Sequence, residues 1–397
     1  MASRQSTYHS SLAIPLALLI GCAPAYLYNK RQQELVLVRV AVGHRLPVAT
    51  IAAVDSMKAR DAAHSTDIPP GSSWTVDCRQ GAVRALTERG TVIQAVGSGL
   101  RLYSTRYRLN GQALAWPLEL RAEGDSGLLA IVELPLEEYL AGVLARELGN
   151  AGESELEAAK AQAVAARSYA YIKIGSKPEA GYDLESDVSN QVFDLGATGS
   201  RTARKAVELT RGQVLVCGGR AVAANYHSTC GGRTAMPSEV WNTADSLFPW
   251  AKSVTDDYCR ISPRFSWQER VPACNVIARL FGIADTTIRL SGVEVGERGG
   301  SGRVQSLKIA SELGDTVLRR DRIRTQLGET ALPSTRFELT CEFDGAGCVA
   351  AINFTGTGYG HGVGMCQWGA IGMAREGKGY KEILGTYYRR VKIKRLF

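Results

Sequence analysis

The chain has 397 residues, enough for one large domain or two medium ones that each bury a full core. Its apolar content of 45% and charged content of 22% are ordinary for a globular protein, and it holds no fixed-period repeat or low-complexity tract. The net charge of +8 suits nucleic acid, anionic lipid or an anionic polymer. Because the sequence carries no nucleic-acid-binding motif, nucleic acid is excluded from the expected partners.

Residues 1–30 are typical of a signal peptide or membrane anchor. The apolar run Leu12–Ile20 follows a start that holds a basic residue and no acidic one. The stretch Leu19-Ile-Gly-Cys22 resembles a bacterial lipobox, in which Cys22 becomes lipidated. The competing interpretation is an uncleaved anchor up to about Tyr28, but it is short for a span of roughly 20 residues and contains prolines. We therefore predict an exported protein that is tethered to the membrane by its N-terminus, with the lipoprotein favoured over the anchor.

Of the 9 cysteines, all but Cys22 lie beyond this segment, which leaves an even number. An even number in an exported chain permits disulfides, although their pairing cannot be read from sequence. Cys341 and Cys348 flank the turn-like stretch Glu-Phe-Asp-Gly-Ala-Gly. We expect a local disulfide between them.

The segment 31–84 combines a weak strand, Leu35–Val42, with a polar stretch, and we interpret it as a linker or small lead-in. From about Arg84 to Val132, short β-branched or aromatic runs broken by Gly and Asn predict hairpins. Residues 85–397 are then expected to form the main domain, with about 260–340 as a candidate subdomain.

Two helices are predicted next, over Leu136–Leu148 and Glu153 to about Ile174. Short strands resume at Val188 and continue to the C-terminus, interrupted by helices near Gln268–Phe281 and Trp368–Glu376. This order predicts an α+β fold, mostly short antiparallel strands with a few helices clustered around a substrate groove.

The first helix carries a carboxylate where an apolar side chain is expected. Leu136, Leu140, Val143 and Leu144 share one stripe, and Glu147 continues it in the last turn before Gly149. Burial disfavours a charged carboxylate and raises its pKa, so Glu147 is a candidate general acid. Periodicity alone leaves a second interpretation open, a glutamate at the edge of the stripe that is paired with a basic residue.

The second helix is rich in alanine, which permits close packing against another element. Lys160, Arg167 and Tyr171 lie on one of its faces at helical spacing. That face is either a surface for an anionic substrate or simply a solvated helix face.

The densest motif is Gly356-Thr-Gly-Tyr-Gly-His361-Gly-Val-Gly-Met-Cys-Gln-Trp-Gly-Ala370. Alternating glycines let a backbone approach a ligand closely, and no βαβ pattern frames them as a dinucleotide site. His361, Gln367 and Trp368 supply a hydrogen-bonding ring, an amide and an apolar stacking face, which together suit a sugar. A glycine-rich strand with bulges and a core tryptophan fits the same pattern.

Five stretches in order are similar to the stage II sporulation protein D (SpoIID/LytB) family, and the resemblance covers roughly residues 85–395. They are Leu134-Pro-Leu-Glu-Glu-Tyr-Leu-Ala-Gly-Val-Leu-Ala-Arg-Glu147, Ala158-Ala-Lys-Ala-Gln-Ala-Val-Ala-Ala-Arg-Ser-Tyr169, Tyr226-His-Ser-Thr-Cys-Gly-Gly232, Ser301-Gly-Arg-Val304 and Gly358 to Ala370.

The resemblance implies a peptidoglycan lytic transglycosylase that acts on glycan strands from which amidases have removed the stem peptides. The family's catalytic acid is a Glu in the helix motif, which corresponds to Glu147. The implied partners are peptidoglycan strands, a cell-wall amidase and the membrane on the cell-wall side. Expected substrate contacts are Lys160, Arg167, Tyr169, Asp187, Gln191, His361, Gln367 and Trp368; in the family the stretch that holds Asp187 lines the groove, although Asp187 also suits a turn.

The resemblance implies no required cofactor, although some relatives bind a structural zinc around the segment His227-Ser-Thr-Cys230. Here His227 and Cys230 are in register, but the nearby His-Cys pair that completes such a site is missing. Cys259 or Cys217 is a candidate substitute, and a Cys230–Cys259 disulfide is an equal expectation in an exported domain.

Two further functions stay open at this point. A non-catalytic wall-binding protein that recruits or stimulates an amidase is the main alternative. A zinc or cysteine peptidase that acts on stem peptides is the other. In its cysteine form, Cys230 or Cys366 is the nucleophile and His227 or His361 is the base, although no cysteine-peptidase motif surrounds them.

Overall fold

The computed structural model describes residues 35–62, 64–87, 90–96, 99–149, 151–186, 191, 193, 200–283 and 288–397. The predicted signal or anchor segment with Cys22, and also Asp187, lie outside these residues. Residues 34–397 form one unit by their contacts. Within the described part of the chain, no helix is both long enough and apolar enough to cross a bilayer.

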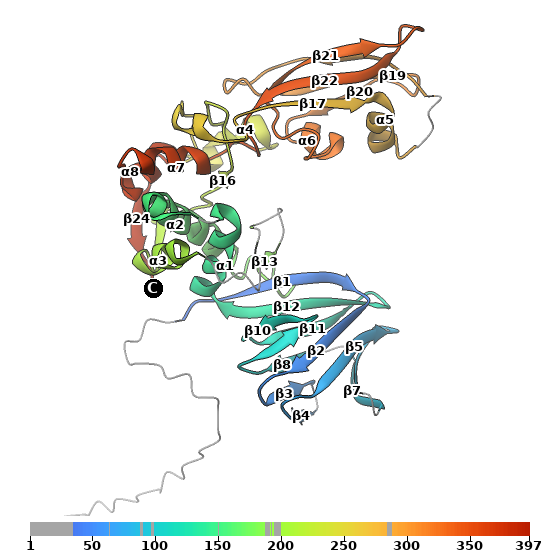
Figure 1. The fold of residues 1–397 in the computed structure, drawn as a ribbon, viewed down its shortest axis with the longest axis vertical. Coiled ribbons are helices and arrows are strands. Elements are labelled where there is room, and N and C mark those ends of the chain that lie inside the picture. Colours follow the sequence, from blue (N-terminus) through green and yellow to red (C-terminus); the bar gives the residue numbers. More distant parts are fainter. Residues whose placement is uncertain are drawn as a thin grey trace, which may run out of the picture. The chain divides into compact units, whose positions relative to one another are not determined.

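Two mostly antiparallel sheets fill the N-terminal part of the described chain (Figure 1). Their strand orders are β13-β1-β12-β11-β8-β3-β4 and β10-β9-β2-β5-β6-β7. Alternation places one face of each strand inside, as in β5, where Trp74, Val76 and Cys78 are buried. The strands are β1 Leu37–Leu46, β2 Val48–Ala53, β3 Met57–Arg60, β4 Ser65–Ile68, β5 Ser73–Arg79, β6 Ala82–Thr87, β7 Gly90–Val96, β8 Leu100–Tyr103, β9 Tyr107–Leu109, β10 Gln112–Leu114, β11 Leu118–Glu123, β12 Gly127–Pro135 and β13 Leu184–Glu185.

From Leu37 on, the segment expected to be a linker or lead-in forms strands β1 to β6 instead. The expected domain boundary at 84/85 falls inside β6, and β1 pairs along its length with β12, from Leu37 opposite Pro135 to Leu46 opposite Leu128. Many inward positions carry only alanine, for example Ala49, Ala53 and Ala59, so the hydrophobic alternation is weak in the sequence. The segment is therefore part of the same core as the helices that follow.

Helices α1 (Leu136–Leu148) and α2 (Leu156–Lys173) have nearly the predicted bounds, and a short 3-10 helix, Glu153–Glu155, precedes α2. Alanines on opposite sides of α2 enter two different cores. Ala159, Ala163, Ala166 and Ala170 pack with the N-terminal sheets, α1 and α3 (Arg201–Leu209). Ala158, Ala161, Val164 and Ala165 pack with β14 (Gln213–Cys217), α7 (Gln367–Arg375) and α8 (Tyr380–Tyr387). A helix buried all round needs small side chains, which the alanine content supplies.

A third sheet, in the order β17-β22-β18-β19-β20 with β21 also paired to β22, has its own core from Trp267 to Phe354 (Figure 1). The helix predicted over Gln268–Phe281 begins only at Ala273; its first part is strand β17, which pairs with β22 and ends at Pro272. The candidate subdomain therefore extends past residue 340 to the end of β22. The elements are β17 Ser266–Pro272, α5 Ala273–Phe281, β18 Leu290–Val295, β19 Ser306–Ser311, β20 Thr316–Arg319, α6 Arg322–Leu327, β21 Phe337–Phe343 and β22 Val349–Thr357.

Short parallel pairings hold the glycine-rich segment beside residues 226–235. Tyr226 and His227 of β16 pair with Met365 and Cys366 of β23, and Ala235 bridges to Val363. The remaining elements are β15 Arg220–Ala221, β16 Tyr226–His227, α4 Pro237–Val240, 3-10 helices Asp245–Leu247 and Tyr258–Ile261, β23 Met365–Cys366 and β24 Lys392–Arg395. The predicted α+β class is confirmed.

Candidate active site

The candidate site is a pocket of about 720 Å³ whose walls come from segments far apart in the sequence. It brings together four residues predicted to act on or hold a substrate: Glu147, Tyr169, His361 and Gln367. The full lining is Glu147, Tyr169, Asn225, Tyr226, His227, Ser228, Trp241, Asp321, Arg324, Thr325, Glu329, Tyr359, Gly360, His361 and Gln367.

Glu147 is oriented by the side chain of Gln367. It lies in the last turn of α1, just before Gly149, whose φ of 56° ends the helix. Gln367 is the first residue of α7 and is buried, and its Nε2 donates a hydrogen bond to Glu147 Oε2 at 2.7 Å. A buried donor fixes the direction of the carboxylate, which is what an acid/base group requires. Glu147 itself is half-buried, so the periodicity overestimated its burial.

Two tyrosines lie in the pocket with Glu147: Tyr169 from α2 and Tyr226 from β16. Burial raises the pKa of Tyr169. Burial and then the negative charge of Glu147 raise the pKa of Tyr226 well above its usual range. Both phenols stay protonated at neutral pH, as ordinary phenols do.

The ring nitrogens of His361 are both occupied by backbone groups. Nδ1 accepts a hydrogen bond from the Val363 amide at 3.1 Å, so Nε2 carries the proton and donates to the Tyr226 carbonyl at 2.9 Å. Burial, followed by the charges of Arg303 and Arg324, lowers the pKa of His361 to about 3. The ring is therefore neutral and contributes an apolar wall rather than the sugar hydrogen bond that we expected.

His227 differs from its neighbour in having one open nitrogen. Its Nδ1 lies 3.2 Å from the Val363 carbonyl and must carry the proton, while Nε2 has no hydrogen-bond partner among the described residues. Burial and then His361 and Arg303 lower the pKa of His227 well below its usual range. The open Nε2 is therefore a buried acceptor in the pocket lining.

The tryptophan of the pocket is Trp241, which sequence analysis missed. Its ring centroid lies 5.3 Å from that of His361 and 6.2 Å from that of Phe248. The predicted stacking residue, Trp368, instead packs its side chain against the core of α7 and α8 and does not line the pocket. The only signal for Trp241 was an aromatic residue within a polar stretch, Glu239-Val-Trp-Asn-Thr243.

The wall near α6 carries charged groups that neutralise one another in part. Arg324 donates from Nε to the Leu332 carbonyl at 3.1 Å, and its other nitrogens lie 3.3 Å from Asp321 and 3.6 Å from Glu329. The lining thus offers three carboxylates, including Glu147, and one guanidinium. It is more acidic than the basic surface expected from the net charge.

The family described as stage II sporulation protein (SpoIID) matches residues 124–217, which include Glu147 and Tyr169. Stage II sporulation protein D of Bacillus subtilis is 30% identical over 280 residues, covering 66% of this chain and 76% of that protein. The chain belongs to the SpoIID family.

Other similarities extend beyond the matched family region. A domain of unknown function, DUF8618, matches residues 248–364, which contribute the α6 wall and the glycine-rich loop. An uncharacterized protein of Brachyspira hyodysenteriae is 32% identical over 269 residues, which is 67% of this chain and 68% of that protein. The amidase enhancer of Bacillus subtilis is 28% identical over 298 residues, which is 63% of this chain and 39% of the enhancer.

Two basic residues predicted to bind substrate, Arg167 and Lys160, form ion pairs within this SpoIID protein instead of lining the pocket. Arg167 is fully buried and forms a 2.7 Å ion pair with Glu137, the buried carboxylate of α1, and it also donates to the Gln213 carbonyl at 3.1 Å. Burial lowers the pKa of Arg167. Lys160 pairs with Glu157 at 2.6 Å and stands 5.2 Å from the ring centre of Tyr380. The shared helix face exists, but it points into the protein.

Gln191 was also predicted to contact substrate, yet it is buried against α2, where its Nε2 donates to the Ala166 carbonyl at 3.2 Å. Of the alternating glycines, Gly360 lines the pocket, whereas Gly362 serves the protein's own packing. Gly362 has a φ of 89°, and a Cβ there would lie 2.5 Å from Cζ of the buried Arg303. Arg303, for which the sequence suggested no role, supports this loop through its bond to the Gly360 carbonyl at 3.3 Å.

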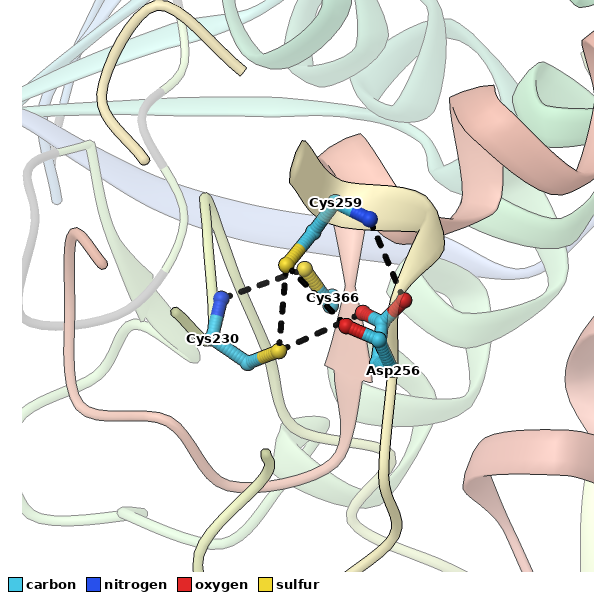
Figure 2. Close-up of side chains that lie close together, drawn as sticks. All are labelled: Cys230, Asp256, Cys259 and Cys366. Carbon is cyan, nitrogen blue, oxygen red and sulfur yellow. Dashed lines mark hydrogen bonds between the residues drawn. The ribbon is translucent and has the colours of Figure 1, made fainter. Parts of the chain in front are cut away.

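Four buried side chains converge beside the pocket: Cys230, Asp256, Cys259 and Cys366 (Figure 2). The Sγ atoms of Cys230 and Cys259 are 3.5 Å apart, so the predicted disulfide between them is absent and both are thiols. His227, predicted as a partner of Cys230 in a metal site, is not in this cluster. Of the two candidate substitutes, Cys259 belongs to the cluster and Cys217 does not. Cys366 and Asp256 complete the cluster, and neither was predicted as a ligand.

The local disulfide predicted between Cys341 and Cys348 is absent as well. The hairpin between β21 and β22 is closed instead by Asp344. Its Oδ1 accepts hydrogen bonds from the amides of Ala346 at 2.9 Å and Cys348 at 3.0 Å. Those amides hold the pKa of Asp344 below its usual value.

Proposed function

We propose that this protein is a lytic transglycosylase that cleaves bonds between N-acetylmuramic acid and N-acetylglucosamine in peptide-stripped peptidoglycan, leaving 1,6-anhydromuramic ends. Membership of the SpoIID family and likeness to a protein named amidase enhancer support a role at the cell wall. The observation that carries the catalytic part is the orientation of Glu147 by Gln367 inside a pocket walled by aromatic rings.

The chemistry needs one carboxyl group that acts twice. Protonated Glu147 donates its proton to the glycosidic oxygen as the bond to C1 breaks. The resulting carboxylate then accepts the proton of the muramic 6-hydroxyl, whose oxygen bonds to C1 of the same sugar. Because the nucleophile belongs to the substrate, its attack gains effective molarity and needs no positioned water. Trp241 and the neutral ring of His361 supply apolar faces for the sugar rings.

Two other carboxylates in the pocket, Asp321 and Glu329, define the hydrolase alternative. A hydrolase needs a second carboxylate as base or nucleophile. Both are close to Arg324, at 3.3 and 3.6 Å, which favours a charge-neutralising role for them. The pocket therefore contains candidates for a second acid, and the products decide between the reactions.

Amidase recruitment without catalysis is the second candidate function. The observation that favours it is the 28% identity to the amidase enhancer. Cysteine peptidase activity is less well supported, because Cys230 and Cys366 are buried and neither lines the pocket.

The test is a digest of amidase-treated glycan strands by the full chain, beside Glu147→Gln, Asp321→Asn and Glu329→Gln. We expect anhydromuramic ends from the wild type, none from Glu147→Gln, and continued cleavage by the other two. Reducing ends that disappear in Asp321→Asn or Glu329→Gln would instead establish a hydrolase. Binding of strands without cleavage, together with a faster amidase in the same mixture, would establish the recruiting protein.

We further propose that the N-terminal segment exports the protein and tethers it to the membrane through Cys22. Incorporation of a labelled fatty acid into the wild type but not into Cys22→Ser tests this proposal. Label in neither protein, with both in the membrane fraction, would favour the uncleaved anchor.

A further inference from the structure

The cluster of Cys230, Asp256, Cys259 and Cys366 joins three segments that surround the site. Cys230 follows β16, Cys259 lies on the 3-10 helix Tyr258–Ile261 with Asp256 just before it, and Cys366 ends β23 and caps α7. None of the four exposes more than 2% of its surface. Figure 2 shows the three sulfur atoms and the carboxylate turned toward a common centre.

The spacing of the donor atoms suits a tetrahedral ion. One donor atom from each of the four residues lies within 4.8 Å of the others. Zn–S bonds of about 2.3 Å place tetrahedral sulfurs roughly 3.8 Å apart, and a carboxylate oxygen roughly 3.5 Å from a sulfur. The observed separations are 3.5 Å for the sulfurs of Cys230 and Cys259 and 3.3 Å for Cys230 Sγ and Asp256 Oδ2.

Backbone amides also point at the sulfurs, as they do when sulfur carries negative charge. Cys366 Sγ accepts from the amides of Cys230 at 3.2 Å and Gly369 at 3.3 Å, the latter at the N-terminus of α7.

Asp256 is buried without a basic partner among its described contacts. It accepts hydrogen bonds from the Tyr387 hydroxyl at 3.0 Å, the Cys259 amide at 3.2 Å and the Cys230 thiol at 3.3 Å. A buried carboxylate that faces thiols rather than Lys or Arg lacks a compensating positive charge. A divalent cation at the centre of the cluster would supply that charge.

We propose that Cys230, Cys259, Cys366 and Asp256 bind one structural zinc ion. Three thiolates and a carboxylate fill its coordination shell, which leaves no open position and makes the site structural rather than catalytic. The ion links β16, the 3-10 helix and the start of α7. Because Cys366 precedes Gln367, the ion also fixes the residue that orients Glu147. This role does not depend on which reaction the pocket performs.

The competing state of the same residues is a disulfide. Two of the three cysteines would then form the disulfide, and the third would remain a thiol. Asp256 would still have no positively charged partner. The two states differ in metal content and in thiol count, so they are separable in the wild type without any mutation.

The first experiment measures zinc by mass spectrometry and counts thiols in the denatured full chain with chelator present. We expect about one zinc per chain and reaction of all cysteine side chains that are not lipidated. Replacement of zinc by Co²⁺ should produce the thiolate charge-transfer band and the strong visible bands of a tetrahedral site. Absence of metal with two thiols missing would overturn the proposal in favour of the disulfide.

Variants then test the ligand set. Cys366→Ser and Cys259→Ser should lose most of the zinc, and Asp256→Asn should bind it at least about tenfold more weakly in competition with a chelator. Cys274→Ser is the matched control, because Cys274 is an exposed thiol outside the cluster and its loss should leave the zinc content unchanged. Full zinc content in Cys366→Ser, or an octahedral cobalt spectrum in the wild type, would refute this coordination.

Discussion

The amide of Gln367 donates to the carboxylate of Glu147 at 2.7 Å across 220 residues of sequence. Gln367 begins α7 and Glu147 lies in the last turn of α1, so the folded core, rather than local structure, sets their distance.

Removal of the Gln367 donor should reduce activity, because the carboxylate of Glu147 loses the bond that orients it. A hydrogen bond to a charged group contributes about 1.5–3 kcal/mol, so Gln367→Leu should lower kcat/KM on glycan strands roughly 10- to 100-fold. The control is Gln268→Leu, at an exposed position on β17. Equal rates for the two variants would show that Gln367 does not orient the acid.

Loss of one partner of the buried pair between Glu137 and Arg167 should destabilise the fold. Arg167→Met leaves Glu137 buried without its cation and should cost about 3–5 kcal/mol in the free energy of unfolding, measured with urea. Lys160→Met breaks a more exposed pair and should cost at most about 1 kcal/mol. A stable Arg167→Met with weakened glycan binding would restore Arg167 as a substrate contact.

The two buried, neutral histidines of the pocket, His227 and His361, should make the stability of the fold sensitive to acid. Their folded pKa values lie below the unfolded value of 6.5, so the unfolded state binds more protons between the two values. Stability is therefore present at neutral pH and is lost as pH falls from about 6.5 toward 3, by at most about 1.4 kcal/mol per pH unit for each ring. His361→Gln should reduce this slope relative to the wild type, whereas His64→Gln, at an exposed ring, should not. Identical slopes for all three proteins would contradict the assigned protonation.

Trp241 should contribute to glycan binding and Trp368 should not. Trp241→Ala removes a stacking face and should weaken binding of glycan fragments by about 1–2 kcal/mol, roughly tenfold, in calorimetric titrations. Trp368→Phe keeps most of the packing against α7 and α8, so its effect should appear in the melting temperature alone. The reverse pattern would support the sequence-based assignment of Trp368.

Gly362 should be intolerant of a side chain for two separable reasons. Both Gly362 and Gly377 have positive φ, 89° and 82°, but only a Cβ at Gly362 meets other atoms, those of Arg303. Gly377→Ala should therefore cost about 1–2 kcal/mol for the backbone alone, and Gly362→Ala about 1–3 kcal/mol more for the clash. Equal losses of stability in urea unfolding would mean that Arg303 moves aside freely.

The parts of the fold that the sequence predicted correctly have strong local patterns. Helix α1 has its predicted bounds because an apolar stripe precedes the breaker Gly149. The region of β17 was predicted as helix because its alternation spans few residues before Pro272 and runs directly into α5. Strands β2 and β3 were missed because alanine at inward positions gives little hydrophobic contrast.

For the site, motif resemblance located Glu147, Tyr169, His361 and Gln367, but it did not reveal which groups touch. Helical spacing correctly placed Lys160 and Arg167 on one face, yet spacing cannot show whether a face meets solvent or the interior. The sequence associated Cys230 with Cys259 but did not add Cys366, because Cys230 and Cys366 are 136 residues apart and meet through the parallel pairing of β16 with β23.

Helix α2 packs into two cores on its opposite sides, and this limits where the chain can be shortened without exposing one of them. The region 124–217 that the SpoIID family model matches contains all of α2, but α7 and α8, which cover one side of it, lie far downstream. A fragment limited to that region would expose Ala158, Ala161, Val164 and Ala165 to water. Residues 124–217 therefore do not complete a core of their own, and a shortened chain needs α7 and α8 to keep this side of α2 buried.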